Sequence, residues 1–337
     1  MNIQENISLK QFNTFGIDKK ARFFTAVQSV SDLKMALTWA KEKHINTLIL
    51  GGGSNILLTQ DQEALVIKNE ITGIELVKED EKYYWVEVGA GVVWHDFVLI
   101  AIQNEWAGVE NLSLIPGTVG ASPMQNIGAY GVEIKDVFHS LTALRKSDLK
   151  LEDFDAKSCA FGYRESVFKH ELKDKYVICS VIFRLNKVAA YHTDYGAIKA
   201  TLAQNGIEHL NLKSISDAVI QIRQSKLPNP KEIGNAGSFF KNPSIPASQY
   251  DSLKADYPEI PGYPNDEGVK VPAAWLIEQC GWKGKRLGEI GVHSKQPLVL
   301  VNYGAGDGNE IKKLAEKIQK SVLEKFQIEI HPEVNFL

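Results

Sequence analysis

Residues 115–131 combine residue types that could form one wall of a binding site. Their sequence is IPGTVGASPMQNIGAYG, with four glycines, two prolines and no Lys, Arg, Asp or Glu. Glycine permits positive φ angles and close approach of a ligand to the backbone, and proline fixes the turns in between. Gln125 and Asn126 add side-chain donors and acceptors. We interpret the segment as a wall against a large, flat ligand with polar edges, the alternative being a buried irregular loop.

A second glycine segment, GGGSN at residues 51–55, follows a strand expected over residues 47–50. Consecutive glycines can turn several backbone N–H groups inward and form an anion nest suited to a pyrophosphate. The dinucleotide fingerprint of the Rossmann fold is absent, because Ile56 stands at the third glycine position and a strand follows instead of a helix. Taken alone, the three glycines fit a tight turn equally well.

Four isolated polar residues could carry chemistry, and each also has an ordinary structural interpretation. Arg164 could hold a carboxylate in a bidentate fork, or make a surface ion pair. Ser238, among small and aromatic residues, could donate a proton or cap a turn. Glu333 would be solvated if it stood alone near the C-terminus, and Lys226 would be a surface lysine. Their joint occurrence, and no single one of them, indicates function.

Composition excludes several classes of protein. The chain has 337 residues, a net charge of −3 and a pI near 6.3, so a nucleic-acid footprint is not expected. No apolar run is long enough for a bilayer, and the N-terminus lacks the pattern of a signal peptide. The three cysteines are isolated, and no histidine spacing fits a metal, so we expect a reducing cytoplasm, no disulfide and no metal site.

Hydrophobic periodicity predicts alternating helices and strands. Helices are expected over residues 33–43, 92–103, 272–280 and 309–326. A capping pattern at Ser214 predicts that a further helix begins there. Strands are expected over residues 47–50, 65–68, 83–88, 137–145, 176–185 and 297–302. The glycine-rich residues 304–308 are interpreted as a loop before a helix capped by Asn309.

Seven motifs taken together resemble the UDP-N-acetylenolpyruvoylglucosamine reductase family. They are NTFG at residues 13–16, GGGSN, the 115–131 segment, FGYRES at 161–166, SKLPNP at 225–230, GNAGSFFKNP at 234–243, and PEV at 332–334. The resemblance covers nearly the whole chain, in family order. It is to the longer type, which carries a tyrosine-bearing segment.

This resemblance implies an α+β fold: an FAD-binding fold of the PCMH/vanillyl-alcohol-oxidase type in two subdomains, plus a C-terminal α/β substrate-binding domain. The expected divisions are residues 1–70 and 71–188 for the two FAD-binding subdomains. Residues 189–337 form the substrate-binding domain, whose C-terminal strand is expected to return to the active site.

The resemblance also implies a cytoplasmic reductase of peptidoglycan precursor synthesis with non-covalent FAD. NADPH reduces FAD and leaves, and the enolpyruvyl sugar nucleotide then takes hydride from flavin N5 at its C3 and a proton at C2. The implied catalytic residues are Arg164 and Glu333, which stabilise the enol form of the substrate carboxylate, and Ser238, the proton donor. The implied cofactor contacts are Gly51, Gly52, Gly53, Ser54, Asn55, Pro116, Gly117, Thr118, Gly120, Ala121, Ser122, Gln125, Asn126, Gly128, Ala129 and Tyr163.

Tyr195, Lys226 and Asn242 are the implied contacts to the diphosphate and sugar nucleotide, with Tyr191 as a nearby alternative to Tyr195. Two other functions stay open: an FAD oxidase of the same broad fold, and a binding protein without catalysis. The absence of His and Cys from residues 51–55 disfavours the covalent flavin tether of many such oxidases. The presence of Arg164, Ser238 and Glu333 disfavours a protein without catalysis. A monomer is expected.

Overall fold

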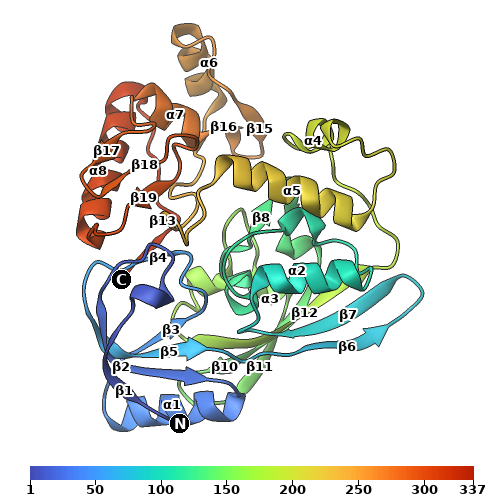
Figure 1. The fold of residues 1–337 in the computed structure, drawn as a ribbon, viewed down its shortest axis with the longest axis vertical. Coiled ribbons are helices and arrows are strands. Elements are labelled where there is room, and N and C mark those ends of the chain that lie inside the picture. The colour runs from blue at the N-terminus through green and yellow to red at the C-terminus, as the bar shows by residue number, and fades with distance from the viewer. The chain divides into compact units, whose positions relative to one another are not determined.

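The computed structural model describes residues 1–337 as helices and strands in two units (Figure 1). Unit 1 comprises Met1–Ile7, Ala21–Gly52 and Glu63–Ser225, and unit 2 comprises Ser8–Lys20, Gly53–Gln62 and Lys226–Leu337. Residues 189–225 therefore group with unit 1, and two short N-terminal segments group with the C-terminal third of the chain. The boundaries of these two units differ from those of the three predicted domains. None of the helices has the length and apolar character of a bilayer-spanning helix.

The first sheet of unit 1 leads directly into the first glycine loop. Its strands lie in the order β1 (Gln4–Ser8), β2 (Lys20–Val27), β5 (Gln62–Asn69) and β3 (Thr47–Leu50). β3 runs parallel to β5 with Leu50 opposite Lys68, so β3 ends where Gly51 begins. Helix α1 (Val30–Glu42) lies beside this sheet (Figure 1), and Leu33 and Leu37 of its apolar face are buried.

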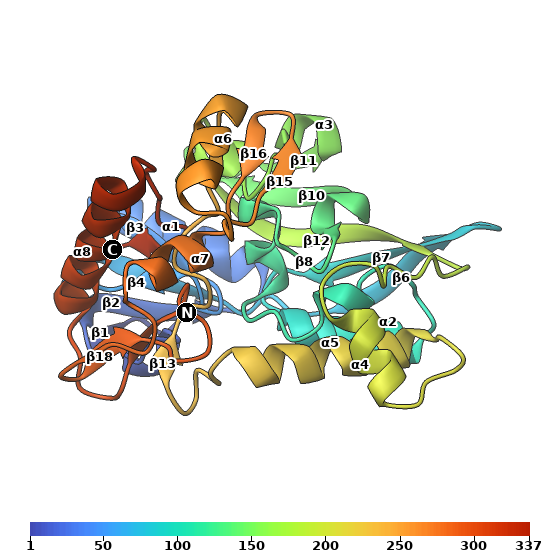
Figure 2. The same cartoon turned by 90° about the horizontal axis from the view of Figure 1, so that it is seen from above.

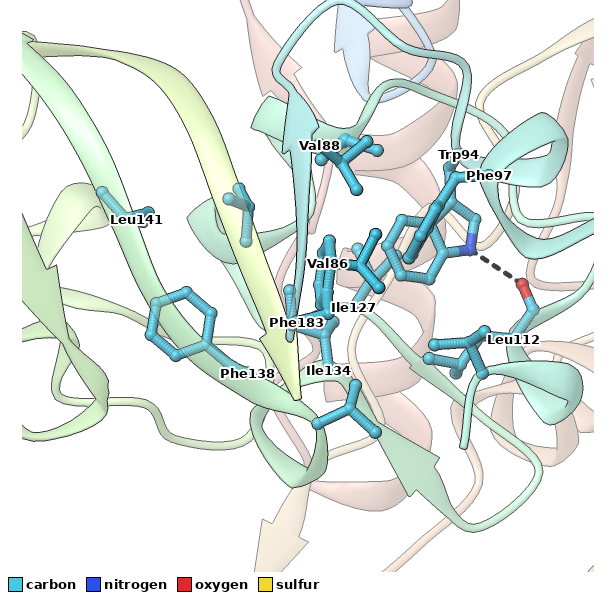
Figure 3. Close-up of a cluster of buried hydrophobic side chains, with 14 of the residues drawn as sticks. Val86, Val88, Trp94, Phe97, Leu112, Ile127, Ile134, Phe138, Leu141 and Phe183 are labelled. Atoms are coloured by element: carbon cyan, nitrogen blue, oxygen red, sulfur yellow. Dashed lines mark hydrogen bonds between the residues drawn. The ribbon is translucent and has the colours of Figure 1, made fainter. Parts of the chain in front are cut away.

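The second sheet of unit 1 supports the longer glycine segment. Its order is β11 (Leu151–Asp155), β10 (Phe138–Arg145), β12 (Tyr176–Asn186), β7 (Tyr83–Gly89) and β6 (Ile74–Glu79). Helix α2 (Trp94–Gln103) packs on it, and Phe97 stacks on Phe183 with ring centroids 4.9 Å apart. Trp94 donates its indole N–H to the carbonyl of Leu112 over 2.9 Å (Figure 3). This core holds the chain that enters residues 115–131.

Three further helices complete unit 1: α3 (Ala156–Cys159), α4 (Ile198–Gln204) and α5 (Leu212–Lys226). α4 and α5 bury Ile198, Ile215 and Val219 in a common apolar cluster, and both views show them close together (Figures 1 and 2). The capping prediction at Ser214 is wrong. Asn211 caps the helix, because its carboxamide oxygen accepts from the backbone N–H of Ser214 over 2.8 Å and the Ser214 hydroxyl bonds back to Asn211 N–H.

Unit 2 contains small sheets and three helices. Its sheets are β13 (Gly234–Asn235), β19 (Leu300–Asn302), β18 (Ile290–Val292) and β17 (Arg286–Leu287); then β14 (Ser244–Ile245), β16 (Gly268–Lys270) and β15 (Tyr263–Asn265); and the pair β20 (Asn335–Phe336) and β4 (Ile56–Leu57). Its helices are α6 (Ala247–Asp256), α7 (Ala273–Gln279) and α8 (Gly308–Phe326). Within unit 2, the parallel pairing of β20 with β4 joins the C-terminus to the segment after the first glycine loop.

The predicted helices and most predicted strands form, with ends that move by a few residues. The strand expected over residues 297–302 is confined to Leu300–Asn302. The capping prediction at Asn309 is wrong. Asp307 caps α8, because its carboxylate accepts from the Asn309 N–H over 2.8 Å and the Glu310 carboxylate accepts from the N–H of Asp307.

Replacing Phe183 with alanine should lower the free energy of unfolding by about 3–5 kcal/mol, because it leaves a cavity between the sheet and α2. Urea unfolding followed by tryptophan fluorescence measures this loss. Val188, which is 82% exposed, provides the control, and its alanine variant should lie within about 0.5 kcal/mol of the parent. Equal effects of the two substitutions would contradict the assigned core.

Candidate active site

Residues 115–131 fold into a series of tight turns within unit 1. Two short 3-10 helices, Val119–Ala121 and Pro123–Gln125, follow one another, and proline begins the second. Gly117 has a φ of 115°, which strongly favours glycine, and Asn126 takes the left-handed conformation with φ 43°. The irregular wall inferred from the sequence is therefore a structured turn region.

The two glycine segments lie against each other in unit 1. A β-carbon on Gly52 would stand 2.7 Å from the Cα atom of Gly117, and one on Gly51 would stand 2.7 Å from the hydroxyl oxygen of Thr118. The Gly52 contact is with backbone and could be relieved only by a shift of the chain, so glycine is required there for close packing, whereas the Gly51 contact is with a side chain. The two loops thereby place their backbone amides in one region of unit 1.

A cavity of about 160 Å³ lies beside these loops in unit 1. Its lining includes four of the predicted cofactor contacts: Gly51, Thr118, Gly120 and Ala121. Met124 and Ile178 add apolar surface. The cavity is smaller than a typical pocket of roughly 300–1,000 Å³ for a whole drug-sized ligand. It fits one end of a long molecule such as a dinucleotide, and these residues therefore fit FAD.

Lys68 is a candidate that the sequence reasoning missed. Its ammonium donates to the carbonyl of Gly51 over 2.5 Å, and burial lowers its pKa while Glu70 opposes the shift. A cation next to a glycine loop complements a bound pyrophosphate. Its position follows from the pairing of Leu50 with Lys68, a tertiary fact that no motif within residues 51–55 reveals.

The second half of the GGGSN loop belongs to unit 2. There Gly53 has a φ of 62°, and Asn55 donates its side-chain amide to the carbonyl of Glu333 over 3.1 Å. The backbone N–H of Asn335 donates to the carbonyl of Asn55 over 3.0 Å. Within unit 2 the C-terminal segment thus lies beside Asn55, with Ser54 preceding it in the same turn.

Ser238 and Glu333 come together in unit 2 although they are far apart in the sequence. The backbone N–H of Glu333 donates to the carbonyl of Phe239 over 2.8 Å, and Phe240 forms a bridge with Pro332. Ser238 is exposed, whereas the rings of Phe239 and Phe240 are buried and fix the segment. Ser238 is therefore an exposed hydroxyl on an anchored segment, next to the residue whose carbonyl accepts from the N–H of Glu333.

Arg164 lies in a four-residue turn of unit 1 closed by bonds between Gly162 and Glu165. Its φ is 58°, an uncommon conformation for a residue other than glycine and one that often accompanies function. The guanidinium donates to the carbonyls of Gly128 over 2.5 Å and Asn126 over 3.3 Å. It also lies over the ring of Tyr163 at 5.3 Å, so several contacts orient it.

The predicted substrate contacts lie in both units. In unit 1, Tyr195 is 63% exposed and its Cβ would lie 3.4 Å from a β-carbon on Gly131, while Tyr191 is 38% exposed. In unit 2, Lys226 is exposed at the end of α5, and the side-chain oxygen of Asn242 accepts from the N–H of Ala273 over 2.9 Å.

The other predicted cofactor contacts belong to unit 1 and line or flank the turn region. Among them, Ser122 is buried and donates its hydroxyl to the carbonyl of Val119 over 2.7 Å, so this bond also stabilises the turn. The remaining predicted contacts lie near it: Pro116 precedes Gly117, Gln125 ends a 3-10 helix, Ala129 lies in the short strand β8 (Gly128–Ala129), and Tyr163 lies beside Arg164. No group of His, Cys, Asp and Glu side chains in the structure could hold a metal ion.

Comparison with known proteins decides the family. Residues 229–337 match the C-terminal domain of UDP-N-acetylenolpyruvoylglucosamine reductase, and residues 21–148 match an FAD-binding domain. The chain is 53% identical to the UDP-N-acetylenolpyruvoylglucosamine reductase of Flavobacterium johnsoniae, with 100% of both chains covered. It is 47% identical to that of Pseudomonas aeruginosa, with 99% of both covered. The chain belongs to the UDP-N-acetylenolpyruvoylglucosamine reductase family.

A solved structure of a family member supports the fold. The reductase from Thermus caldophilus aligns with a TM-score of 0.70 at 21% identity and covers 100% of this chain and 99% of its own. The predicted fold class is confirmed: an FAD-binding domain of the PCMH/vanillyl-alcohol-oxidase type and a C-terminal domain, in a mixed α/β protein.

Replacing Gly52 with alanine should lower the FAD content of the purified protein several-fold, because the new methyl group would press on Gly117. Absorbance of flavin against protein in the visible spectrum measures this content. Gly162→Ala is the control, since a β-carbon there would lie 3.4 Å from that of Glu165 and should leave the FAD content unchanged. A fully loaded Gly52→Ala protein would contradict the proposed cofactor position.

Proposed function

We propose that this chain reduces UDP-N-acetylglucosamine enolpyruvate to UDP-N-acetylmuramate, a step of peptidoglycan precursor synthesis, with NADPH as the reductant. The observation that carries the proposal is the 53% identity over the full length of a UDP-N-acetylenolpyruvoylglucosamine reductase. FAD, when bound, supplies the chemistry of accepting a hydride from NADPH and passing it to the enolpyruvyl group. The match to an FAD-binding domain and the cavity beside Gly51 and Thr118 support this cofactor.

The cofactor-binding proposal rests on backbone groups of the two glycine segments. The amides of residues 51–53 would hold the pyrophosphate as an anion nest. The Lys68 ammonium, which donates to the Gly51 carbonyl, would add positive charge beside it. The turns of residues 116–129 would pack along the flavin. Residues 51–55 contain neither His nor Cys, so binding through this loop is non-covalent.

Arg164 is assigned to the substrate carboxylate. Addition of hydride at C3 of the enol ether moves electrons onto the carboxylate oxygens, and a fixed guanidinium stabilises that charge. The two bonds from Arg164 to the carbonyls of Asn126 and Gly128 support this role, because they orient the group before substrate arrives.

Ser238 and Glu333 are assigned to proton transfer on the same substrate. The hydroxyl of Ser238 would deliver a proton to C2, whose developing carbanion is a strong base. Glu333 would hold the enol form of the carboxylate by accepting or donating a proton. The bond between Phe239 and the N–H of Glu333 supports this pairing.

Tyr195, Lys226 and Asn242 are assigned to the diphosphate and sugar nucleotide. Tyr195 is more exposed than Tyr191, which supports its assignment to the substrate over that of Tyr191. From the tyrosine-bearing segment we also infer membership of the longer type. We further infer that residues 1–70 and 71–188 act as FAD-binding subdomains and residues 189–337 as the substrate-binding domain. The enzyme is inferred to act as a cytoplasmic monomer, in accord with its free cysteines.

Ser238→Ala should separate the two half-reactions. NADPH should still bleach the flavin at nearly the normal rate, whereas reoxidation by the enolpyruvyl sugar nucleotide should slow by roughly 10²–10⁴-fold or more, the contribution typical of a general acid. Stopped-flow absorbance measures each half-reaction separately. Ser238→Cys should restore part of the rate, since a thiol also donates a proton.

Equal slowing of both half-reactions, or of neither, would make Ser238 a structural residue. The same measurement distinguishes the reductase from an oxidase. A reductase is reoxidised slowly by air and rapidly by its substrate, and an oxidase shows the opposite order. A binding protein without catalysis would show no turnover in either direction.

Lys226→Ala should raise the KM for the sugar nucleotide and weaken the salt dependence of its binding, because the diphosphate loses one compensating charge. Isothermal titration at two ionic strengths, combined with steady-state kinetics, measures both effects. Lys231→Ala is the matched control, since Lys231 is also exposed and lies five residues away on the chain. Unchanged affinity and salt dependence in Lys226→Ala would return this residue to an ordinary surface role.

A further inference from the structure

The Arg164 guanidinium is held by one short turn of the long glycine segment. Its two Nη atoms donate to the carbonyls of Asn126 and Gly128, the residues on either side of Ile127. A β-carbon on Gly128 would lie 2.8 Å from Arg164 Nη1, so glycine at 128 makes room for the guanidinium. This part of the glycine segment therefore holds the Arg164 guanidinium in place.

Asn126 ties this turn to the loop that carries Arg164. Its side chain is fully buried, and its amide nitrogen donates to the carbonyl of Gly162 over 2.9 Å and to the carboxylate of Glu133 over 3.1 Å. Its amide oxygen accepts from the backbone N–H of Lys135 over 3.1 Å. One side chain thus bonds to the Arg164 loop and to the strand that follows the glycine segment.

Glu133 places a fixed negative charge beside the same guanidinium. One carboxylate oxygen lies 3.6 Å from Arg164 Nη1, and the other lies 2.7 Å from the ammonium of Lys135. The hydrogen bond with Glu133 raises the pKa of Lys135. Lys135 offsets part of the Glu133 charge, which limits competition between Glu133 and a substrate carboxylate for Arg164.

We propose that Asn126 is a positioning residue for Arg164, and that Glu133 orients the guanidinium with it. The proposal rests on the proposed function, in which Arg164 binds the carboxylate of the enolpyruvyl group. Without the Asn126 side chain, the Gly162 carbonyl loses its bond to Asn126, and this bond ties the Arg164 turn to the segment that holds the guanidinium. A misplacement of about 1 Å at such a group costs on the order of 10²-fold in rate.

Asn126→Gly is the decisive variant, because glycine accepts the left-handed backbone at this position and removes only the side chain. Reoxidation of the reduced flavin by the enolpyruvyl sugar nucleotide should slow by about 10- to 100-fold. Because Asn126 is also an implied cofactor contact, both rates are taken per bound FAD, and on that basis reduction by NADPH should slow much less than reoxidation. The dissociation constant of the substrate for the oxidised enzyme, measured by calorimetry, should rise several-fold, which gives a readout independent of turnover.

A double-mutant cycle with Arg164→Lys tests whether Asn126 acts through Arg164. The effect of Asn126→Gly on reoxidation should largely disappear in the Arg164→Lys background, because the fork that Asn126 positions is gone. Additive effects of the two substitutions would overturn the proposal. Equal slowing of both half-reactions per bound FAD would overturn it too and leave Asn126 with a cofactor role alone.

Glu133→Gln decides the case if Asn126→Gly does not fold. This nearly isosteric change removes the charge beside Arg164, and it should slow reoxidation several-fold while NADPH reduction stays normal. Normal reoxidation in Glu133→Gln would overturn the proposal in that case. Normal reoxidation in Arg164→Lys itself would instead overturn the role of Arg164 in the proposed function, so the two failures are distinguishable.

Discussion

The close approach of two glycine backbones is the constraint on which the cofactor end of unit 1 depends. A β-carbon on Gly52 would stand 2.7 Å from the Cα of Gly117, so neither loop could keep its place with a larger residue at 52. The parallel pairing of β3 with β5 brings the first loop there, and the core under α2 supports the second. The two loops thereby meet beside one cavity of unit 1.

The long glycine segment performs two tasks with different residues. Its first part, around Gly117, Thr118 and Gly120, lines the cavity. Its second part, around Asn126 and Gly128, holds the Arg164 guanidinium by its carbonyls. A single structured segment therefore carries both the residues that line the cavity and the carbonyls that hold Arg164, the group assigned to the substrate carboxylate.

Local signals predicted the secondary structure well and the helix caps poorly. The apolar periodicity of α1 and α8 depends only on residues three and four apart, so it is visible in the sequence. The predicted caps are wrong because Asn211 and Asp307 each exchange two hydrogen bonds with the residue three positions later in the chain. A nearby Ser or Asn gives a competing local signal. The Lys68–Gly51 bond was missed because it depends on which strands pair.

By itself, the sequence determined the family, the alternation of helices and strands, and the residue types that carry the chemistry. Glycine and proline set which backbone conformations a segment can adopt, whatever surrounds it. What they indicate about a turn can therefore be inferred from the local sequence. Tertiary structure alone decided which segments meet: Gly52 with Gly117, Phe239 with Glu333, and Asn126 with the loop of Arg164. These contacts join residues far apart along the chain, and they form only when burial of the cores fixes the strands and turns that carry them.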